Sequence, residues 1–295
     1  MIENGANPFL SSAWLGHCGL EHSVYHFNNT SAALSRFSMK GLRGVKILAT
    51  PPWALDCGLS IDCPSSDFES LTNTWLQEPE AIKIIDLPPS DLNSSLVKNH
   101  TPSGFKIQWR HTRQLDLNTP LPSTRRKQIR RADKAGITCK IVKCWAGVAK
   151  LHAKSRSRKN INSNNTQLAK LLEAISHEPF SFAVEATNSD GKCIASGGFI
   201  FVSPDICLYS FGGQIRSQHS GIASVSMLSF AMTHALENGA TTFDFGGSSD
   251  PGVDRFYKEF DAKTVAKARL ISVAWWLRPF IKLLSPFSKT AKILN

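Results

Sequence analysis

The spacing of apolar residues along the second half of the chain predicts a regular order of strands and helices. Three strands follow one another closely, and then come a helix, a strand, a short helix and a last strand. The expected ranges are 180–186, 193–202, 206–212, 222–238, 241–245, 252–260 and 265–273. Asp190-Gly191 is a hairpin signal between the first two strands. This order predicts an α+β layer with a mostly antiparallel sheet.

The first half also mixes the two kinds of element. Apolar runs predict strands at 45–50, 81–87, 105–109 and 138–142, and helical spacing predicts helices at 67–75, 123–135 and 165–177. Gly136 stands where a glycine commonly ends a helix, and Ser123 or Thr124 is expected to cap its start. The prolines, serines and asparagines of residues 88–102 predict a loop.

The length of 295 residues is suited to two domains. We expect a first domain over 1–122, a second over 123–275 and a basic amphipathic tail over 276–295. No apolar run of about 18 residues occurs and no secretion signal is visible at the start, so we expect a cytoplasmic protein.

The seven cysteines form no C-x-x-C pair. Zinc sites and disulfide frameworks need closer or more regular spacing. We therefore expect buried or free thiols in a reducing compartment and no metal site.

The net charge of +11 is concentrated in two segments. Residues 123–159 carry thirteen lysines and arginines and one acid, Asp133, and the chain after Asp261 carries seven basic residues and no acid. Such segregation is typical of a protein with an anionic partner, such as phosphate, nucleic acid or lipid headgroups. A solvated helix face is the alternative.

The C-terminal stretch 275–284 combines basic, aromatic and apolar residues. This composition fits a segment that lies on an anionic membrane surface, and we extend that expectation to residues 263–295. A last helix packed on its own domain, with Trp275 and Trp276 buried, is the alternative, and Pro279 weakens a continuous helix.

The sharpest local pattern is Q-x-x-G-x-A, which spans Gln218 to Ala223 at the start of the predicted helix. Gly221 lets the backbone approach a ligand closely, and the first N–H groups of a helix have no partner within it. With the positive end of the helix dipole, these donors form a site for an anion such as the diphosphate of coenzyme A.

Two further passages complete a resemblance. Residues 243–247 read Phe-Asp-Phe-Gly-Gly, and residues 256–262 read Phe-Tyr-Lys-Glu-Phe-Asp-Ala. In this order the chain resembles the GNAT acyltransferases, and more closely their Fem-type (FemABX) branch, which builds peptidoglycan cross-bridges, with its acetyltransferase relatives. Residues 123–136 resemble the stretch that opens the second GNAT unit of that branch.

The resemblance covers residues 123–275 and reaches 1–122 only in outline. It implies an α+β GNAT fold, built as two tandem GNAT-like units with a degenerate first one. It also implies that an acyl-CoA co-substrate lies along the strand that ends near 212 and at the following helix. The cofactor-binding residues implied are Ser210, Phe211, Gly212, Gln218, His219, Ser220, Gly221, Ile222 and Ala223. Alanine replaces the stricter glycine at 223.

Acyl transfer to an amine needs proton transfer and stabilisation of negative charge. The catalytic candidates are Lys258, Asp244, Tyr257 and Tyr209, and Glu185 and His219 are further acid–base candidates. Lys258 matches a charge-stabilising lysine of the Fem-type branch, or is a surface lysine. Asp244 faces away from its two phenylalanine neighbours, as a base or as a structural hydrogen-bond acceptor.

We therefore expect an N-acyltransferase that uses acetyl-CoA or another acyl-CoA and an amine acceptor, either a small molecule or a peptidoglycan precursor. A Fem-like transferase that takes its group from aminoacyl-tRNA is the first alternative. A non-catalytic protein of the same fold that binds nucleic acid or anionic membrane is the second.

Overall fold

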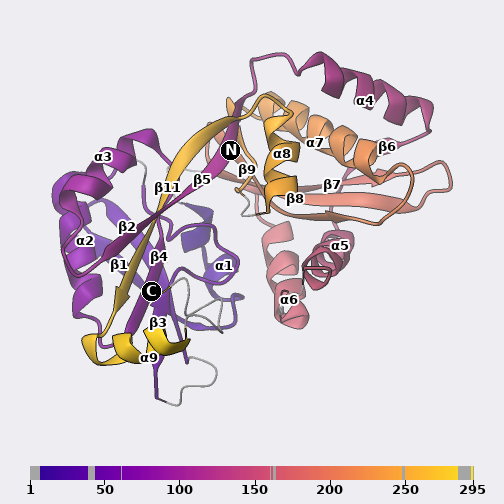
Figure 1. The fold of residues 1–295 in the computed structure, drawn as a ribbon. Helices are drawn as coiled ribbons and strands as arrows, with labels where there is room; N and C mark the ends of the chain where they lie inside the picture. The colour runs from indigo at the N-terminus through magenta and orange to yellow at the C-terminus, as the bar shows by residue number, and fades with distance from the viewer. Residues whose placement is uncertain are drawn as a thin grey trace. The chain divides into compact units, whose positions relative to one another are not determined.

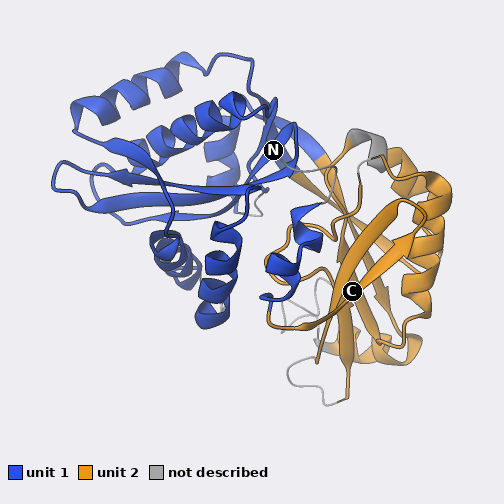
Figure 2. Ribbon diagram, turned by 180° about the vertical axis from the view of Figure 1, so that it is seen from behind, with its two compact units in different colours: residues 1–18, 112–265 blue, residues 19–111, 266–295 orange. Residues whose placement is uncertain are grey.

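The computed structural model describes residues 7–38, 44–60, 62–159, 161, 164–247, 250–284 and 294. The chain forms two compact units (Figure 2). Unit 1 comprises residues 1–18 and 112–265, and unit 2 comprises 19–111 and 266–295. Each unit is built from two stretches that are separated in the sequence, so the units are not consecutive segments of the chain. The mixed α+β class is confirmed.

The sheet of unit 1 has the strand order β5-β10-β9-β8-β7-β6. Strands β6 to β9 are antiparallel neighbours, and β10 pairs in parallel with β9 and antiparallel with β5. The bounds are β5 Lys106–Asp116, β6 Thr138–Val142, β7 Ser181–Thr187, β8 Cys193–Ser203, β9 Ile206–Gln214 and β10 Thr242–Asp244.

Helices cover both faces of this sheet (Figure 1). Helix α4 packs on α7, which lies on β7 and β8, while α5 packs on β8 and β9 and also on α6. The bounds are η1 Pro8–Leu10, α1 Ser12–Leu15, α4 Ser123–Lys134, α5 Ala146–Ser157, α6 Asn165–Ser176, α7 Ser220–Glu237 and α8 Pro251–Lys258. Apolar side chains of α7 and aromatic rings of the strands, including Phe199 and Phe243, form the main core.

Unit 2 has the strand order β1-β2-β3-β4-β11, and its helices α2 and α3 pack against each other. The bounds are β1 Glu21–Phe27, β2 Thr30–Ser38, β3 Lys46–Ala49, α2 Ser65–Gln77, β4 Ile82–Asp86, α3 Asp91–His100, β11 Lys263–Val273, η2 Trp275–Leu277 and α9 Arg278–Leu284. Phe68, Leu71 and Trp75 of α2 pack on strand residues such as Leu34 and Ile85.

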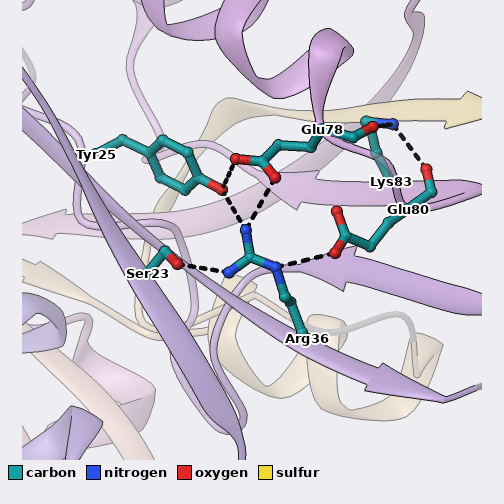
Figure 3. A network of polar contacts seen from close by, with 6 residues as sticks. All are labelled: Ser23, Tyr25, Arg36, Glu78, Glu80 and Lys83. Carbon is teal, nitrogen blue, oxygen red and sulfur yellow. Dashed lines mark hydrogen bonds and ion pairs between the residues drawn. The ribbon is translucent and has the colours of Figure 1, made fainter.

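A polar network centred on Arg36 fixes β1, β2 and the turn before β4 (Figure 3). The Arg36 guanidinium bonds Glu80 at 2.9 Å and Glu78 at 2.9 Å, and it donates to the Tyr25 hydroxyl at 3.1 Å. Burial, and then the hydrogen bond to Glu78, raises the pKa of Tyr25. Because the Glu80 side chain is only 2% exposed, its charge depends on Arg36 for compensation.

Several sequence expectations need correction. Residues 91–100 form a helix instead of a loop, because Val97 turns into the core of unit 2. Helix α4 begins without a side-chain cap, since its N-cap residue is Pro122, so the predicted Ser123 or Thr124 cap is wrong. Gly136 does follow this helix with φ +70°, as predicted. The strands β1 and β2 and the helix α5 were not predicted.

None of the helices in the described part of the chain has the length and apolar character needed to cross a bilayer. Cys57 and Cys207 are free thiols and are fully buried.

Candidate functional site

The strands β9 and β10 diverge after a short stretch of pairing. Residues Ile206 to Leu208 pair with Thr242 to Asp244, and there the parallel ladder ends. Strand β9 continues to Gln214, whereas the chain beyond β10 turns away through Gly246 and Gly247, whose φ angles of 75° and 70° favour glycine. Within the described residues, the backbone of 209–214 therefore has no strand partner on the β10 side.

A β-bulge lies where this unpaired edge begins. Tyr209 pairs with Phe199 and Phe211 pairs with Gly198, so Ser210 is the extra residue. The bulge directs Tyr209 and Phe211 to opposite faces: Tyr209 stacks on Phe199 at 5.3 Å, and Phe211 contacts the His152 ring at 5.5 Å. The buried Ser210 hydroxyl has no hydrogen-bond partner in the protein.

Two glycines next to the bulge are required by packing. A Cβ at Gly212 would lie 1.9 Å from the Tyr209 hydroxyl, and a Cβ at Gly213 would lie 2.3 Å from the carbonyl oxygen of Leu151 in α5. Gly212, which was predicted to contact the co-substrate, thus also makes room for Tyr209.

The residues of the Q-x-x-G-x-A pattern, at the start of α7, differ in their exposure to solvent. Gln218, His219 and Gly221 are exposed, Ile222 is half-buried, and Ala223 lies fully in the core. The N-cap residue His219 makes no side-chain capping bond.

Ser220 belongs to the turn that leads into the helix. Its hydroxyl donates to the Ser217 carbonyl at 2.9 Å. At Gly221, an added Cβ would meet nothing within 4 Å, so the space beside this helix start is open.

The two tyrosine candidates lie on the same side of the unit. Tyr257 stacks on Phe245 at 4.7 Å. Its pKa is raised well above the usual range, mainly by burial and then by the nearby Tyr209, Asp244 and Asp250, which disfavour a negative charge on its hydroxyl. Burial also raises the pKa of Tyr209. Both hydroxyls are therefore protonated at neutral pH.

Asp244 is 3% exposed and fully engaged. Its carboxylate accepts hydrogen bonds from the Thr112 hydroxyl, from the Gln114 amide at 2.9 Å and from the backbone N–H of Gly246 at 2.7 Å. These bonds tie β10 to β5 and fix the turn at which β10 leaves β9. Asp244 therefore has a structural role: it holds the chain at the point where β10 leaves β9.

The other acid–base candidates lie elsewhere. Lys258 is exposed at the end of α8. Glu185 lies against α5, because a Cβ at Gly147 would be 2.1 Å from its carboxylate oxygen, and so it is on the opposite face of the sheet from Tyr209.

His152 was not predicted as a site residue. Its Nδ1 accepts a hydrogen bond of 3.2 Å from the backbone N–H of Gly212, at the unpaired part of β9. Burial, and then the charge of Arg156, lowers the pKa of His152 to about 4. The basic composition of residues 123–159 concealed α5; the spacing of Val148, Leu151 and His152 was the available signal.

The basic segment divides into buried and exposed residues. Arg125 is 2% exposed, donates to the carbonyl oxygen of Phe256 at 2.5 Å and pairs with Glu259 at 3.1 Å. It joins α4 to α8 and is therefore engaged within the protein. The other basic residues of α4 lie exposed on one face of the helix: Arg126, Lys127, Arg130, Arg131 and Lys134.

Among the described residues, no group of His, Cys, Asp and Glu side chains is arranged to hold a metal ion.

Comparisons with known proteins identify the fold. No family model matches the chain, and no curated protein matches it. Among solved structures, the chain is similar to FemX, with a TM-score of 0.65 and 12% identity over 92% of this chain and 93% of that one. It is similar to L-PGS from Bacillus licheniformis, with a TM-score of 0.59 and 12% identity over 92% and 94% of the two chains.

A third similar structure is the C-terminal domain of a protein described as a lysylphosphatidylglycerol synthetase from Agrobacterium fabrum. Its TM-score is 0.58 and its identity 14%, over 88% of this chain and 87% of that one. The predicted resemblance to the Fem-type branch of the GNAT fold is thereby confirmed at the level of the fold.

We predict that Asp244→Asn lowers the free energy of unfolding by about 1–3 kcal/mol, because an amide nitrogen cannot accept one of the three hydrogen bonds that the carboxylate accepts. Urea denaturation measures the loss. Asp133→Asn, on the exposed side of α4, is the matched control and should change little. An unchanged stability of Asp244→Asn would contradict the role of Asp244 as an anchor.

We predict that His152 makes the protein less stable in mild acid. An unfolded histidine has a pKa of about 6.5, so between that value and about 4 the unfolded chain binds a proton that the folded chain does not. Stability therefore rises with pH across this window, and His152 accounts for a loss of about 2 kcal/mol between pH 7 and pH 5. Urea denaturation at the two pH values measures it.

The control for this prediction is the exposed His22, replaced by glutamine in parallel with His152→Gln. The loss between pH 7 and pH 5 should shrink in His152→Gln and persist in His22→Gln. An equal loss in both variants would assign the acid sensitivity to other groups.

Proposed function

We propose that the chain is an N-acyltransferase that moves an acyl group from acyl-CoA to an amine. The observation that carries the proposal is the divergence of β9 from β10, which leaves residues 209–214, before the chain enters α7, without a strand partner on the β10 side. An extended ligand can add to such an edge through main-chain hydrogen bonds, and a helix N-terminus accommodates a diphosphate.

Two details of the site support an extended polar ligand there. The buried Ser210 hydroxyl lacks a protein partner, which is costly unless a ligand or water satisfies it. The space beside Gly221 is open, because no atom lies within 4 Å of the position that a Cβ would take there, so a ligand has room at this end of the helix. The N–H of Gly212 already donates to His152, so a ligand that accepts from this N–H would replace His152 as the acceptor.

The protonated hydroxyls of Tyr209 and Tyr257 are hydrogen-bond donors for the thiolate that leaves in the proposed reaction. In the proposed reaction the amine nitrogen bonds the acyl carbon, the carbon–sulfur bond breaks, the amine loses a proton and the thiolate gains one. Because burial raises the pKa values of Tyr209 and Tyr257, both hydroxyls are protonated at neutral pH and unsuited to act as bases, and each can donate a hydrogen bond that stabilises the thiolate as it forms. Lys258, exposed on α8, remains a candidate for binding negative charge of the donor.

The proposal is tested by Gly221→Asp. Acetyl-CoA should raise the melting temperature of the unmodified protein, and the aspartate should abolish the shift because it puts a carboxylate where the diphosphate binds. The fold should not suffer, since the position is open and an acid in the first turn stabilises a helix. Differential scanning fluorimetry measures both quantities.

Thr233→Asp is the matched control, because it adds the same charge to an exposed position of the same helix. It should keep the acetyl-CoA shift. The proposal fails if the unmodified protein shows no shift with any acyl-CoA, or if Gly221→Asp and Thr233→Asp respond alike.

The exposed stripe of α4 favours a second candidate, transfer from aminoacyl-tRNA. Five basic side chains share one face of the helix, and they have no aromatic residues among them, which suits phosphate more than unstacked bases. Arg126→Gln/Arg130→Gln/Lys134→Gln should then weaken tRNA retention in filter binding and reduce its salt dependence. Lys150→Gln/Lys154→Gln, with exposed lysines of α5, is the control. Absence of retention at low salt would exclude this donor.

A further inference from the structure

Four large apolar side chains are exposed on one short stretch of unit 2. Trp275 is 80% exposed, Leu283 72%, Phe280 58% and Trp276 46%, which makes them the most exposed large apolar residues of the described chain. They lie in η2 and α9, immediately after β11. The alternative of two buried tryptophans is therefore wrong.

This stretch is held firmly on the unit. Leu277 and Ile281, four residues apart, are each 2% exposed and pack into a core with residues of β3, β4 and β11. The N–H of Ala274 donates to Ala81 at 2.7 Å, and the Arg278 guanidinium donates to the carbonyl oxygen of Val273 at 3.2 Å. One side of the stretch is thus anchored, while the other presents apolar side chains to solvent.

The exposed charges beside these side chains are positive. Arg278 and Lys282, four residues apart, are exposed, and no acid occurs between residues 262 and 284. Other basic residues of the tail point inward: Lys267 donates to the carbonyl oxygen of Leu55, and Arg269 pairs with Asp86 at 2.7 Å. Within the described part of the predicted 263–295 segment, exposed apolar and basic side chains therefore occur together at 275–283, and residues 285–293 and 295 lie outside the described residues.

A pocket of about 640 Å³ adjoins this stretch within unit 2. Lys106, Arg278 and Lys282 contribute cationic groups to its lining, and Trp275 contributes an aromatic ring. Apolar side chains, among them Ile271, complete it. Cationic groups beside apolar ones suit a ligand that is anionic at one end and apolar at the other.

We propose that residues Trp275 to Leu283 dock on a bilayer that contains anionic phospholipid, with a lipid phosphate bound in the adjoining pocket. Tryptophan favours the interface of a membrane, apolar side chains enter the boundary of the acyl region, and basic residues bind the headgroups. A second copy of the chain suits this surface poorly, because in a symmetric contact Arg278 and Lys282 would face the same charges without an acid. The proposal does not depend on the transferase activity.

Vesicle flotation tests the proposal with the full chain. Vesicles of phosphatidylcholine with roughly 30% phosphatidylglycerol should retain the protein, and pure phosphatidylcholine should retain much less of it. Arg278→Gln/Lys282→Gln should lower the partition coefficient on the anionic vesicles roughly 30-fold, from about 5-fold for each basic residue near the surface. Trp275→Ser/Phe280→Ser/Leu283→Ser should lower it on both kinds of vesicle.

The controls place equivalent changes elsewhere. Trp109→Ser/Phe230→Ser removes two other exposed aromatic side chains, and Arg130→Gln/Lys134→Gln removes two charges from α4. Both should keep flotation, and thermal unfolding should show that every variant is folded. The proposal is overturned if the unmodified protein does not float on anionic vesicles, or if the α4 variant loses flotation and the α9 variants keep it.

Size-exclusion chromatography with light scattering tests whether a second copy of the chain covers this surface instead. A dimer that the Trp275→Ser/Phe280→Ser/Leu283→Ser variant dissociates would assign the surface to a second copy and overturn the membrane proposal. The acetyl-CoA shift serves as an independent readout: its retention in the α9 variants, together with lost flotation, supports membrane docking as a property separate from donor binding.

Discussion

The buried carboxylate of Asp244 accepts hydrogen bonds from two side chains of β5 and from the turn that follows β10. A buried carboxylate without hydrogen-bond partners would cost free energy of folding, so the folded state favours the arrangement that keeps all three bonds. These bonds hold the end of β10 against β5 and direct the following chain away from β9. Without that divergence, β10 could continue along β9, and its backbone would occupy the edge at 209–214. The candidate site therefore depends on a constraint that lies outside it.

The bulge at Ser210 acts on the same strand from within. It places Tyr209 on the face that carries Phe199 and Tyr257, and Phe211 on the face that carries His152. Strict alternation would put Tyr209 and Phe211 on one face. The extra residue thus lets one strand supply a hydroxyl to one face and an aromatic ring to the other, and the missing side chain at Gly212 leaves room for that hydroxyl.

The sequence predicted the elements whose periodicity is strong, such as α6 and the run from β7 to β11, and it predicted the strand-to-helix passage of the candidate site. It could not predict α5, because basic residues hid its apolar positions, or α3, because turn-forming residues outnumber its apolar ones. The role of His152 and the anchoring of Asp244 depend on contacts between residues far apart in the chain, which spacing does not encode. The assembly of each unit from two separate stretches of the chain also depends on such long-range contacts.

Net charge along the sequence also says little until each basic side chain is located. Arg125, Lys267 and Arg269 are bound to groups of the protein, so they contribute to its stability and offer little to a partner. Two groups of exposed charges differ in their setting: the basic side chains of α4 share a helix face without aromatic residues among them, whereas Arg278 and Lys282 lie in a stretch with exposed tryptophan, phenylalanine and leucine. A bare row of cations suits a hydrated polyanion, and cations among apolar groups suit a lipid interface. The neighbours of the charges, more than their number, decide which partner each surface fits.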